Sequence, residues 1–484
     1  MRDFLTTIRP SVVKVVVGLG FCVSAISSAD AGDLEWSGLY RVEAYAISAS
    51  EVNSSSGNKD YGLHHLILRP KIVASDGIDI IGRFDIINSS DSTLANSQVG
   101  GFFGDGLNNS GSTASTGDQS NTLGEKQAAE ELEITQLYMT YTHEFGSLIV
   151  GRAPLHFGLG MTHNAGDGEF DHWYDTRDLL AYKLVLGNLT VTPMYAKLVE
   201  NSLSKNIDDV NEYSVQLIYD NPDSDLAMGV MYQARRSGSQ GNDTPASDTG
   251  IGGGSGTPSA SREAIEVDQF NLHIERRGEE FRVGIEGAFA DGKYGVISGD
   301  GADVTFGGSG VALEAEYFPK NSSYTWGLNA GYAQGDDASS GGEFEGFLFD
   351  RNYDVATLLF NHELGSQDLL GTAFFRGDQQ SSNSRVDVEA ITNAYYVSPY
   401  VTVKWSDKWN TRVRIVTGSL IEDRVGGDTD LGYEVDVSLT YKPTDRITWH
   451  NEVAYFMPGS AFELGTGEST NTVLGLITKV AISF

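Results

Sequence analysis

The chain has a single cysteine among its 484 residues, half as many basic as acidic residues, and no long apolar segment after its N-terminus. Cys22 falls within a predicted export signal, so the mature chain is expected to contain no disulfide, thiolate nucleophile or thiolate metal site. Beyond that signal no segment offers about 18 consecutive apolar residues, the minimum for a membrane-spanning helix. We therefore expect a mature chain that is not held together by disulfides and that has no transmembrane helix.

The shortage of positive charge excludes further classes of function. The chain carries 33 basic and 66 acidic residues, a formal net charge of -33. Bulk charge of this sign disfavours binding to nucleic acid or to anionic polymers. GxSxG, HExxH and P-loop sequences are also missing, and the glycine-rich run 252–256 lacks the lysine and the strand-to-helix context of a phosphate site. Catalysis by a familiar motif is thus disfavoured.

The N-terminus has the organisation of a secretory signal peptide. Arg2, Arg9 and Lys14 precede the apolar run 15–26, and the small residues at 29–31 suit a signal peptidase. We predict that residues 1–31 are removed and that residues 32–484 form the mature protein. About 450 residues would ordinarily suggest several soluble domains, but no linker divides this chain. One large domain is expected.

Alternation of apolar and polar residues runs through the mature chain and is clearest near its end. Tyr433, Val435, Val437, Leu439 and Tyr441 alternate with Glu434, Asp436, Ser438, Thr440 and Lys442. A strand of this kind has one face for hydrocarbon and another for water. The pattern returns in residues 447–455 and again in 480–484, where the last residue is Phe484.

An alternating strand that closes on a terminal aromatic residue is typical of bacterial outer-membrane barrels, and the chain resembles the outer-membrane porins of that superfamily. The resemblance implies an all-β fold, a single transmembrane antiparallel up-and-down β-barrel, in the outer membrane of a Gram-negative bacterium. It implies that Phe484 is a barrel-assembly signal, with the barrel-assembly machinery as a partner. No cofactor and no metal ion are expected.

Short turns and long polar loops alternate along the chain, as periplasmic turns and external loops do in bacterial barrels. The expected turns are 75–77, 144–146, 187–188, 221–224, 277–279, 319–321, 406–408 and 443–446. The expected loops are 54–58, 89–130, 155–178, 201–211, 237–262, 291–308, 334–390, 422–430 and 458–471. The breaks predict about 18 strands, within a range of 16 to 20, and an even number returns both ends to the periplasm.

One segment, residues 344–375, does not fit this alternation of short turns and long polar loops. Residues 347–349, 358–360 and 374–375 are too apolar for a solvated loop. Either the segment folds into the lumen or over the mouth, or it adds a hairpin and makes about 20 strands. Because residues 358–360 lack the two-residue period of a strand, the inserted loop is the favoured interpretation.

If the aliphatic and aromatic side of each strand faces lipid, the charged residues between them face the lumen. This rule predicts fifteen pore-lining candidates: Arg41, Glu43, Arg152, Lys183, Arg282, Glu286, Glu314, Glu316, Lys404, Arg412, Arg414, Glu434, Asp436, Glu452 and Lys479. Two interpretations of these charges stay open. They pair across strands and stabilise a water-exposed inner wall, or they form opposed positive and negative clusters that create an electric field across a constriction.

A histidine-rich segment is the strongest metal-site candidate, and we discount it. His156, His163 and His172 lie among Asp167, Glu169 and Asp171, but their spacing matches no defined zinc or calcium loop. Ordinary polar contacts within a loop are the simpler interpretation.

Two parts of the chain, one of them discontinuous, resemble a more specific type of channel. Residues 151–160, together with 393–404, 431–434 and 457–459, resemble the alginate-export type of channel. That resemblance implies an eighteen-strand barrel with Arg152, Arg412 and Arg414 in the lumen. An exporter of a polyanionic sugar should have a strongly positive pore, which this negative chain does not offer. Alginate itself is therefore doubtful as the solute.

These observations predict a passive channel for small hydrophilic solutes with a modest preference for cations. Two alternatives stay open, a structural or surface-recognition barrel with long loops and an outer-membrane lipid hydrolase. The acidic loops would either share divalent cations with lipopolysaccharide or attract cations to the mouth. Outer-membrane lipid and lipopolysaccharide are expected partners, nucleic acid is not, and a homo-oligomer is left open.

Overall fold

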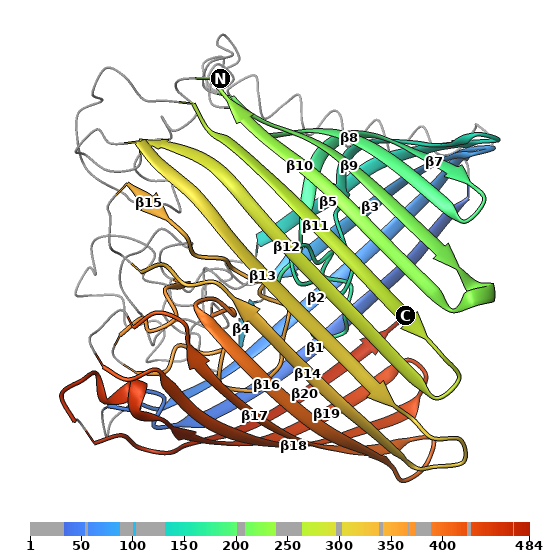
Figure 1. Ribbon diagram of the computed structural model, residues 1–484. Coiled ribbons are helices and arrows are strands. Elements are labelled where there is room, and N and C mark those ends of the chain that lie inside the picture. Colours follow the sequence, from blue (N-terminus) through green and yellow to red (C-terminus); the bar gives the residue numbers. More distant parts are fainter. Residues whose placement is uncertain are drawn as a thin grey trace, which may run out of the picture.

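The chain folds into one closed antiparallel β-barrel (Figure 1). The structure is a computed structural model that describes residues 33–53, 57–87, 100–102, 131–200, 209–238, 264–296, 303–337, 342–365, 367–372, 389–423, 427–467 and 469–484. Eighteen of the strands in these residues form the barrel wall. In order round the wall they are β1 (Leu34–Ser48), β2 (Lys59–Ser75), β3 (Ile78–Ile87), β5 (Glu131–His143), β6 (Gly146–Pro154), β7 (Thr176–Leu186), β8 (Leu189–Val199), β9 (Val210–Asn221), β10 (Leu226–Ser237), β11 (Glu266–Arg277), β12 (Phe281–Val296), β13 (Asp303–Tyr317), β14 (Tyr324–Ala333), β16 (Ala394–Lys404), β17 (Trp409–Leu420), β18 (Asp430–Thr444), β19 (Ile447–Pro458) and β20 (Val473–Ser483).

Short accessory elements complete the described secondary structure. Strand β4 (Gly100–Phe102) pairs with β2, and β15 (Glu343–Phe344) runs parallel to β13. Two 3₁₀ turns, η2 (Pro222–Ser224) and η3 (Ser460–Glu463), lie between strands. Within the described residues, no helix is long and apolar enough to cross a bilayer.

The predicted strand number and the alternation of turns and loops are confirmed. Every second connection is a short turn, such as Asp76-Gly77 between β2 and β3, where Gly77 adopts a φ of 74°. At the turn into β10, the Asn221 side chain accepts a hydrogen bond from the Asp223 amide at 3.0 Å, and Pro222 fixes the turn backbone. The predicted signal peptide 1–31 lies outside the described residues, as do most of the loops predicted at 89–130, 201–211 and 237–262.

The barrel closes where β1 pairs with both β2 and β20. Beyond the end of β20, the Phe484 amide donates to the Gly38 carbonyl at 3.0 Å, and the Gly38 amide donates back at 2.9 Å. A Cβ atom at position 38 would lie 2.5 Å from the Phe484 ring, so glycine leaves space for the aromatic side chain. The first and last strands are thus joined at the seam, where the Phe484 ring packs against the backbone of Gly38.

The two faces of the wall have opposite character. On β18, Tyr433 and Val437 are 43% and 41% exposed on the outside, whereas Glu434 and Asp436 are 0% and 3% exposed on the inside. Trp36, Trp326, Trp409 and Trp449 face outward close to the turn ends of their strands. An apolar exterior flanked by aromatic residues is the pattern of a barrel embedded in a bilayer.

The wall is uneven in height. Strands β6 and β7 have 9 and 11 residues, whereas β12 and β13 have 16 and 15. One low part of the wall is thus the place where the chain leaves β6 and turns into the barrel interior, and β14 and β16, with 10 and 11 residues, are similarly short.

The face assignment gives a direct test at Val437, which lies midway along β18 between the outward residues Val413 and Val453. We expect Val437→Arg to lower the free energy of unfolding by roughly 2–4 kcal/mol, because the charge would face hydrocarbon. Denaturant unfolding of the barrel in lipid vesicles measures this. Ser406→Arg, in a turn, is the control and should change little. Equal stability of both variants would mean that this face does not contact lipid.

Candidate functional site

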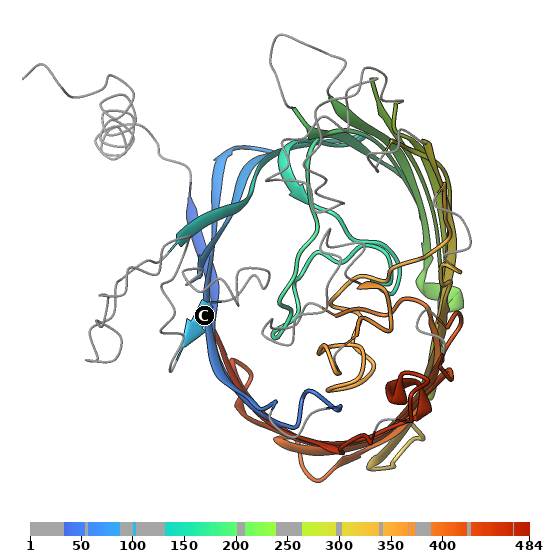
Figure 2. The same cartoon turned by 90° about the vertical axis from the view of Figure 1, so that its left-hand side faces the viewer.

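Two segments enter the barrel interior, as the view along the barrel shows (Figure 2). The first luminal loop, residues 155–175, connects β6 to β7, and the second luminal loop, described at residues 345–365, 367–372 and 389–393, lies between β15 and β16. The favoured interpretation of residues 344–375 is confirmed for the described part of that segment, which is buried against the wall and adds no hairpin. Insertion of the first loop was not predicted, since its sequence is polar enough for an external loop.

Glu286 of β12 holds the first luminal loop to the wall. Its carboxylate accepts hydrogen bonds from the amides of Leu159 at 2.6 Å, Met161 at 3.2 Å and Thr162 at 3.2 Å. The Thr162 hydroxyl adds a fourth bond at 2.9 Å. The side chain is 0% exposed, so these bonds replace the water that a buried carboxylate loses.

Glu434 of β18 holds the second luminal loop in the same way. It accepts hydrogen bonds from the amides of Thr357 at 3.0 Å, Leu358 at 2.8 Å and Leu359 at 2.7 Å. This carboxylate is also 0% exposed. Three successive amides that converge on one anion orient the loop backbone and satisfy both partners.

Further anchors tie the first luminal loop to β1 and β3. His172 Nε2 lies 3.0 Å from both carboxylate oxygens of Glu43, which also accepts a 2.6 Å bond from the Tyr45 hydroxyl. Arg41 forms an ion pair with Glu43 at 3.1 Å. Arg83 donates to the Gly166 carbonyl at 3.0 Å. The loop is therefore fixed on both sides of the barrel, because Glu286 lies on β12.

Apolar packing completes the attachment of the second loop. Phe349, Leu358 and Phe360 are at most 2% exposed and belong to one cluster with wall residues Tyr396 and Phe456. The Phe360 and Tyr396 rings lie 6.0 Å apart. Part of the barrel interior is thus a packed core.

The two luminal loops are joined to each other around Asn352. Its side-chain oxygen accepts from the amides of His172 at 3.2 Å and Trp173 at 3.0 Å, and its amide nitrogen donates to the Trp173 carbonyl at 2.8 Å. The Asp350 amide donates to Met161 at 2.7 Å. The Arg351 guanidinium lies 4.4 Å from the centre of the Trp173 ring. We call this contact the loop junction.

A partly buried carboxyl group, that of Asp350, lies at this loop junction. Burial, together with the negative charges of Asp175 and Asp171, raises the pKa of Asp350 to about 8. Burial opposes ionisation of Asp175 as well, but His163 and Arg177 lower its pKa. Asp350 therefore favours its neutral form, whereas Asp175 favours its charged form.

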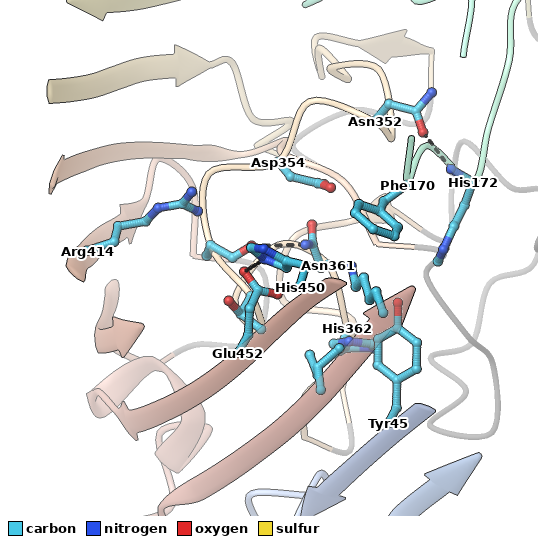
Figure 3. A pocket seen from close by; sticks show the side chains of 14 residues that line it. Tyr45, Phe170, His172, Asn352, Asp354, Asn361, His362, Arg414, His450 and Glu452 are labelled. Atoms are coloured by element: carbon cyan, nitrogen blue, oxygen red, sulfur yellow. Dashed lines mark hydrogen bonds and ion pairs between the residues drawn. The ribbon is translucent and has the colours of Figure 1, made fainter. Parts of the chain in front are cut away.

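A cavity of about 190 Å³ lies between the loop junction and the wall formed by β17, β19, β20 and β1 (Figure 3). The wall contributes both signs of charge, with Arg414, Glu452 and Lys479 at its surface, and the second loop adds Asp354. His450 Nε2 lies 3.0 Å from Glu452. The remaining lining residues are Tyr45, Phe170, His172, Asn352, Ala356, Thr357, Asn361, His362 and Ile477. The cavity is thus a narrow, polar part of the lumen.

A second charged group lies closer to the periplasmic turns. Arg282 pairs with Glu275 at 3.1 Å and with Glu314 at 3.3 Å. The Tyr400 hydroxyl donates to Glu316 at 2.7 Å, and the Arg412 guanidinium lies 4.4 Å from the Tyr400 ring centre. These residues pair across strands, which is the simpler of the two interpretations of inward charge.

Fourteen of the fifteen predicted pore-lining residues lie on the inward face. Arg152 is the exception: it lies on the outer face beside Val150, because Ala153 is the buried, inward residue there. Glu43, Glu286, Glu434, Arg41 and Asp436 face inward but are at most 3% exposed, so these five side chains are buried and do not line open water. The loops cover the first three. Lys183 and Lys404 are exposed near the turns, where Lys404 pairs with Asp407 at 2.8 Å.

Sequence reasoning missed the loop residues of the cavity, His172, Asn352, Asp354 and Asn361. The histidine-rich segment was a partial signal, since its residues serve as ordinary polar contacts between loop and wall. His163, for example, lies 2.8 Å from Gln233 Oε1 and 3.2 Å from Asp175. Nothing local in the sequence marks Asn352 as the residue that joins two loops.

No protein-family model matches the chain, and no curated protein sequence matches it. Solved structures do match. OccAB2 of Acinetobacter baumannii is 9% identical, with a TM-score of 0.52 over 94% of this chain and 99% of that one. OccK11 (OpdR) of Pseudomonas aeruginosa is 10% identical, with a TM-score of 0.50 over 93% and 96%. A BenF-like porin from Pseudomonas fluorescens Pf-5 is 10% identical, with a TM-score of 0.49 over 94% and 100%.

At such low identity the two matches with TM-scores of 0.50 and 0.52 show the fold alone, a closed antiparallel β-barrel. Together with the apolar exterior, the fold supports an integral outer-membrane location. The resemblance to the alginate-export type of channel finds no support in these matches.

Removing the Glu434 carboxylate should loosen the second luminal loop. We expect Glu434→Ala to lower the free energy of unfolding by roughly 1–3 kcal/mol, because three buried amides lose their acceptor. Limited proteolysis within the loop should become faster. Glu434→Gln keeps the oxygen that accepts two of the three bonds and should have a smaller effect. Glu279→Ala, in an exposed turn, is the control. A resistant loop in Glu434→Ala would show that packing alone holds it.

The loop junction should weaken as the pH rises. The folded-state pKa of Asp350 is raised from its ordinary 3.8 to about 8, so its stabilising contribution is complete below pH 4 and is lost as the pH passes 8. Proteolysis of the second loop should therefore be faster at pH 9 than at pH 6. Asp350→Asn should remove this difference. A difference that persists in Asp350→Asn would assign the pH dependence to another group.

Proposed function

We propose that the protein is a passive outer-membrane channel for small hydrophilic solutes and not an enzyme. The observation that carries this proposal is the polar cavity inside a closed barrel, bounded on one side by wall charges and on the other by the two anchored loops. A packed, fixed constriction narrows the passage to small solutes, and its polar lining can replace part of their hydration. The porin-type fold supports the same function.

The cavity's charge is close to balanced. Arg414 and Lys479 carry positive charge, and Glu452 and Asp354 carry negative charge. Four of the inward carboxylates expected to favour cations are instead buried in loop anchors or in the wall. We infer that cation preference comes mainly from the acidic chain as a whole, with net charge -33, and is modest.

Planar bilayers containing the purified mature protein should show stepwise conductance. The same recordings give the ion selectivity from the reversal potential in a salt gradient. Cation preference should be clear at 0.1 M salt, where the Debye length is about 10 Å, and weaker at 1 M, where it is about 3 Å. A correctly folded protein that stays silent would refute the channel function.

Single charges at the cavity should move the selectivity in opposite directions. Arg414 faces the cavity in Figure 3. Arg414→Gln should increase cation preference and Glu452→Gln should decrease it. A unit charge about 4 Å from a passing ion contributes about 1 kcal/mol in water, or roughly fivefold in permeability ratio. Asp407→Asn, at a fully exposed turn position, is the control. Unchanged selectivity in both cavity variants would place the passage elsewhere in the lumen.

A further inference from the structure

We propose that a second copy of the chain docks on the outer face of β6 and β7, through the ion pair between Arg152 and Asp178. The proposal is independent of what passes through the lumen. It depends on the barrel being embedded in a membrane.

The ion pair faces away from the lumen. Arg152 and Asp178 are direct partners in the β6–β7 register, with Nε–Oδ1 and Nη2–Oδ2 distances of 2.7 and 2.9 Å. Their side chains are 49% and 53% exposed. Val150 and Leu180, the next outward pair toward the periplasm, are exposed as well. The charges therefore belong to the apolar outer face.

The pair also lies within the depth of the lipid-facing band. Arg152 is six residues from Gly146, where β6 begins at a turn, which corresponds to about 15 Å along the barrel axis at a strand tilt of about 40°. The apolar band of such barrels is about 25 Å tall. On β5, Leu137 is the direct partner of Arg152, and the outward residues Ile134 and Leu132 lie further from the turn. The apolar exterior thus extends past the ion pair.

Hydrocarbon is an unfavourable neighbour for an exposed Arg and Asp. The wall is also low at this place, since β6 ends at Pro154 and β7 begins at Thr176, where the first luminal loop enters the barrel. A protein surface against β6 and β7 would shield the charges and raise the effective height of the wall.

The arrangement of charge favours a second copy as the occupant. A positive and a negative group side by side are self-complementary about a twofold axis along the membrane normal, which would bring Arg152 of each copy opposite Asp178 of the other. An anionic lipid phosphate would be attracted by Arg152 but repelled by Asp178. We therefore assign the surface to an isologous dimer contact.

Cysteine cross-linking tests the contact cleanly, because the chain's one cysteine, Cys22, lies in the predicted signal peptide. Leu180→Cys puts a thiol on the proposed interface, and Ile415→Cys puts one on β17, across the barrel; both positions are about half exposed. With a short bis-maleimide in native membranes, we expect at least fivefold more dimer from Leu180→Cys than from Ile415→Cys. Equal or absent cross-linking would overturn the proposal.

Charge-reversal variants of Arg152 and Asp178, made in the Leu180→Cys chain, then distinguish an ion pair within one copy from ion pairs between two copies. Arg152→Asp alone and Asp178→Arg alone should each reduce cross-linking at least fivefold. Co-expression of the two variants should restore it as a mixed dimer, which only a contact between copies can explain. Failure of the mixture to exceed either variant alone would overturn the proposal.

A neutral variant covers the case in which the charged variants misfold. Arg152→Leu with Asp178→Leu suits lipid, so the barrel should fold, as judged by its heat-modifiable migration, and should be monomeric. Undiminished cross-linking in that variant would count against the ion pair. Loss of co-purifying lipid phosphate with unchanged cross-linking would assign the surface to lipid instead.

Discussion

Capture of backbone amides by wall carboxylates is the interaction on which the interior depends. Glu286 and Glu434 each accept three amide hydrogen bonds from a luminal loop, and each is inaccessible to solvent. A loop inside a barrel has no sheet partner for its amides, and an unpaired buried amide is destabilising. A carboxylate solves this problem for three amides at once, and the loop in turn replaces the carboxylate's water.

This arrangement links the wall to the shape of the passage. The anchors fix each loop on the wall, Asn352 fixes the loops to each other, and the cavity is the space that these contacts leave beside β17, β19, β20 and β1. The charges that line the cavity are therefore a subset of the inward charges. Arg414, Glu452 and Lys479 line this cavity, whereas Glu43 is occupied by His172.

The strands of the barrel wall could be predicted from the sequence, but most of the structure of the barrel interior could not. Period-two alternation is a local property, so strand number, turn positions and face could be predicted residue by residue, as Val437 and Glu434 illustrate. Arg152 failed because its neighbours Gly151 and Ala153 are small and gave no apolar side to assign. Loop insertion depends on contacts such as Glu286 with Leu159, which are 127 residues apart. No local pattern encodes such a pair, although the apolar residues 347–349 and 358–360 did reveal one of the two loops.

The seam between β1 and β20 constrains the order in which the protein can assemble. Ser48 and Leu474 meet there across 426 positions of chain, so the seam is among the most non-local contacts of the molecule and is expected to form late. Strand β1 also carries Glu43 and Arg41, which hold the first luminal loop. Once the seam is shut, a loop would have to thread through the mouth to reach them. Filling the interior and shutting the wall are therefore coupled events, and the same strand takes part in both.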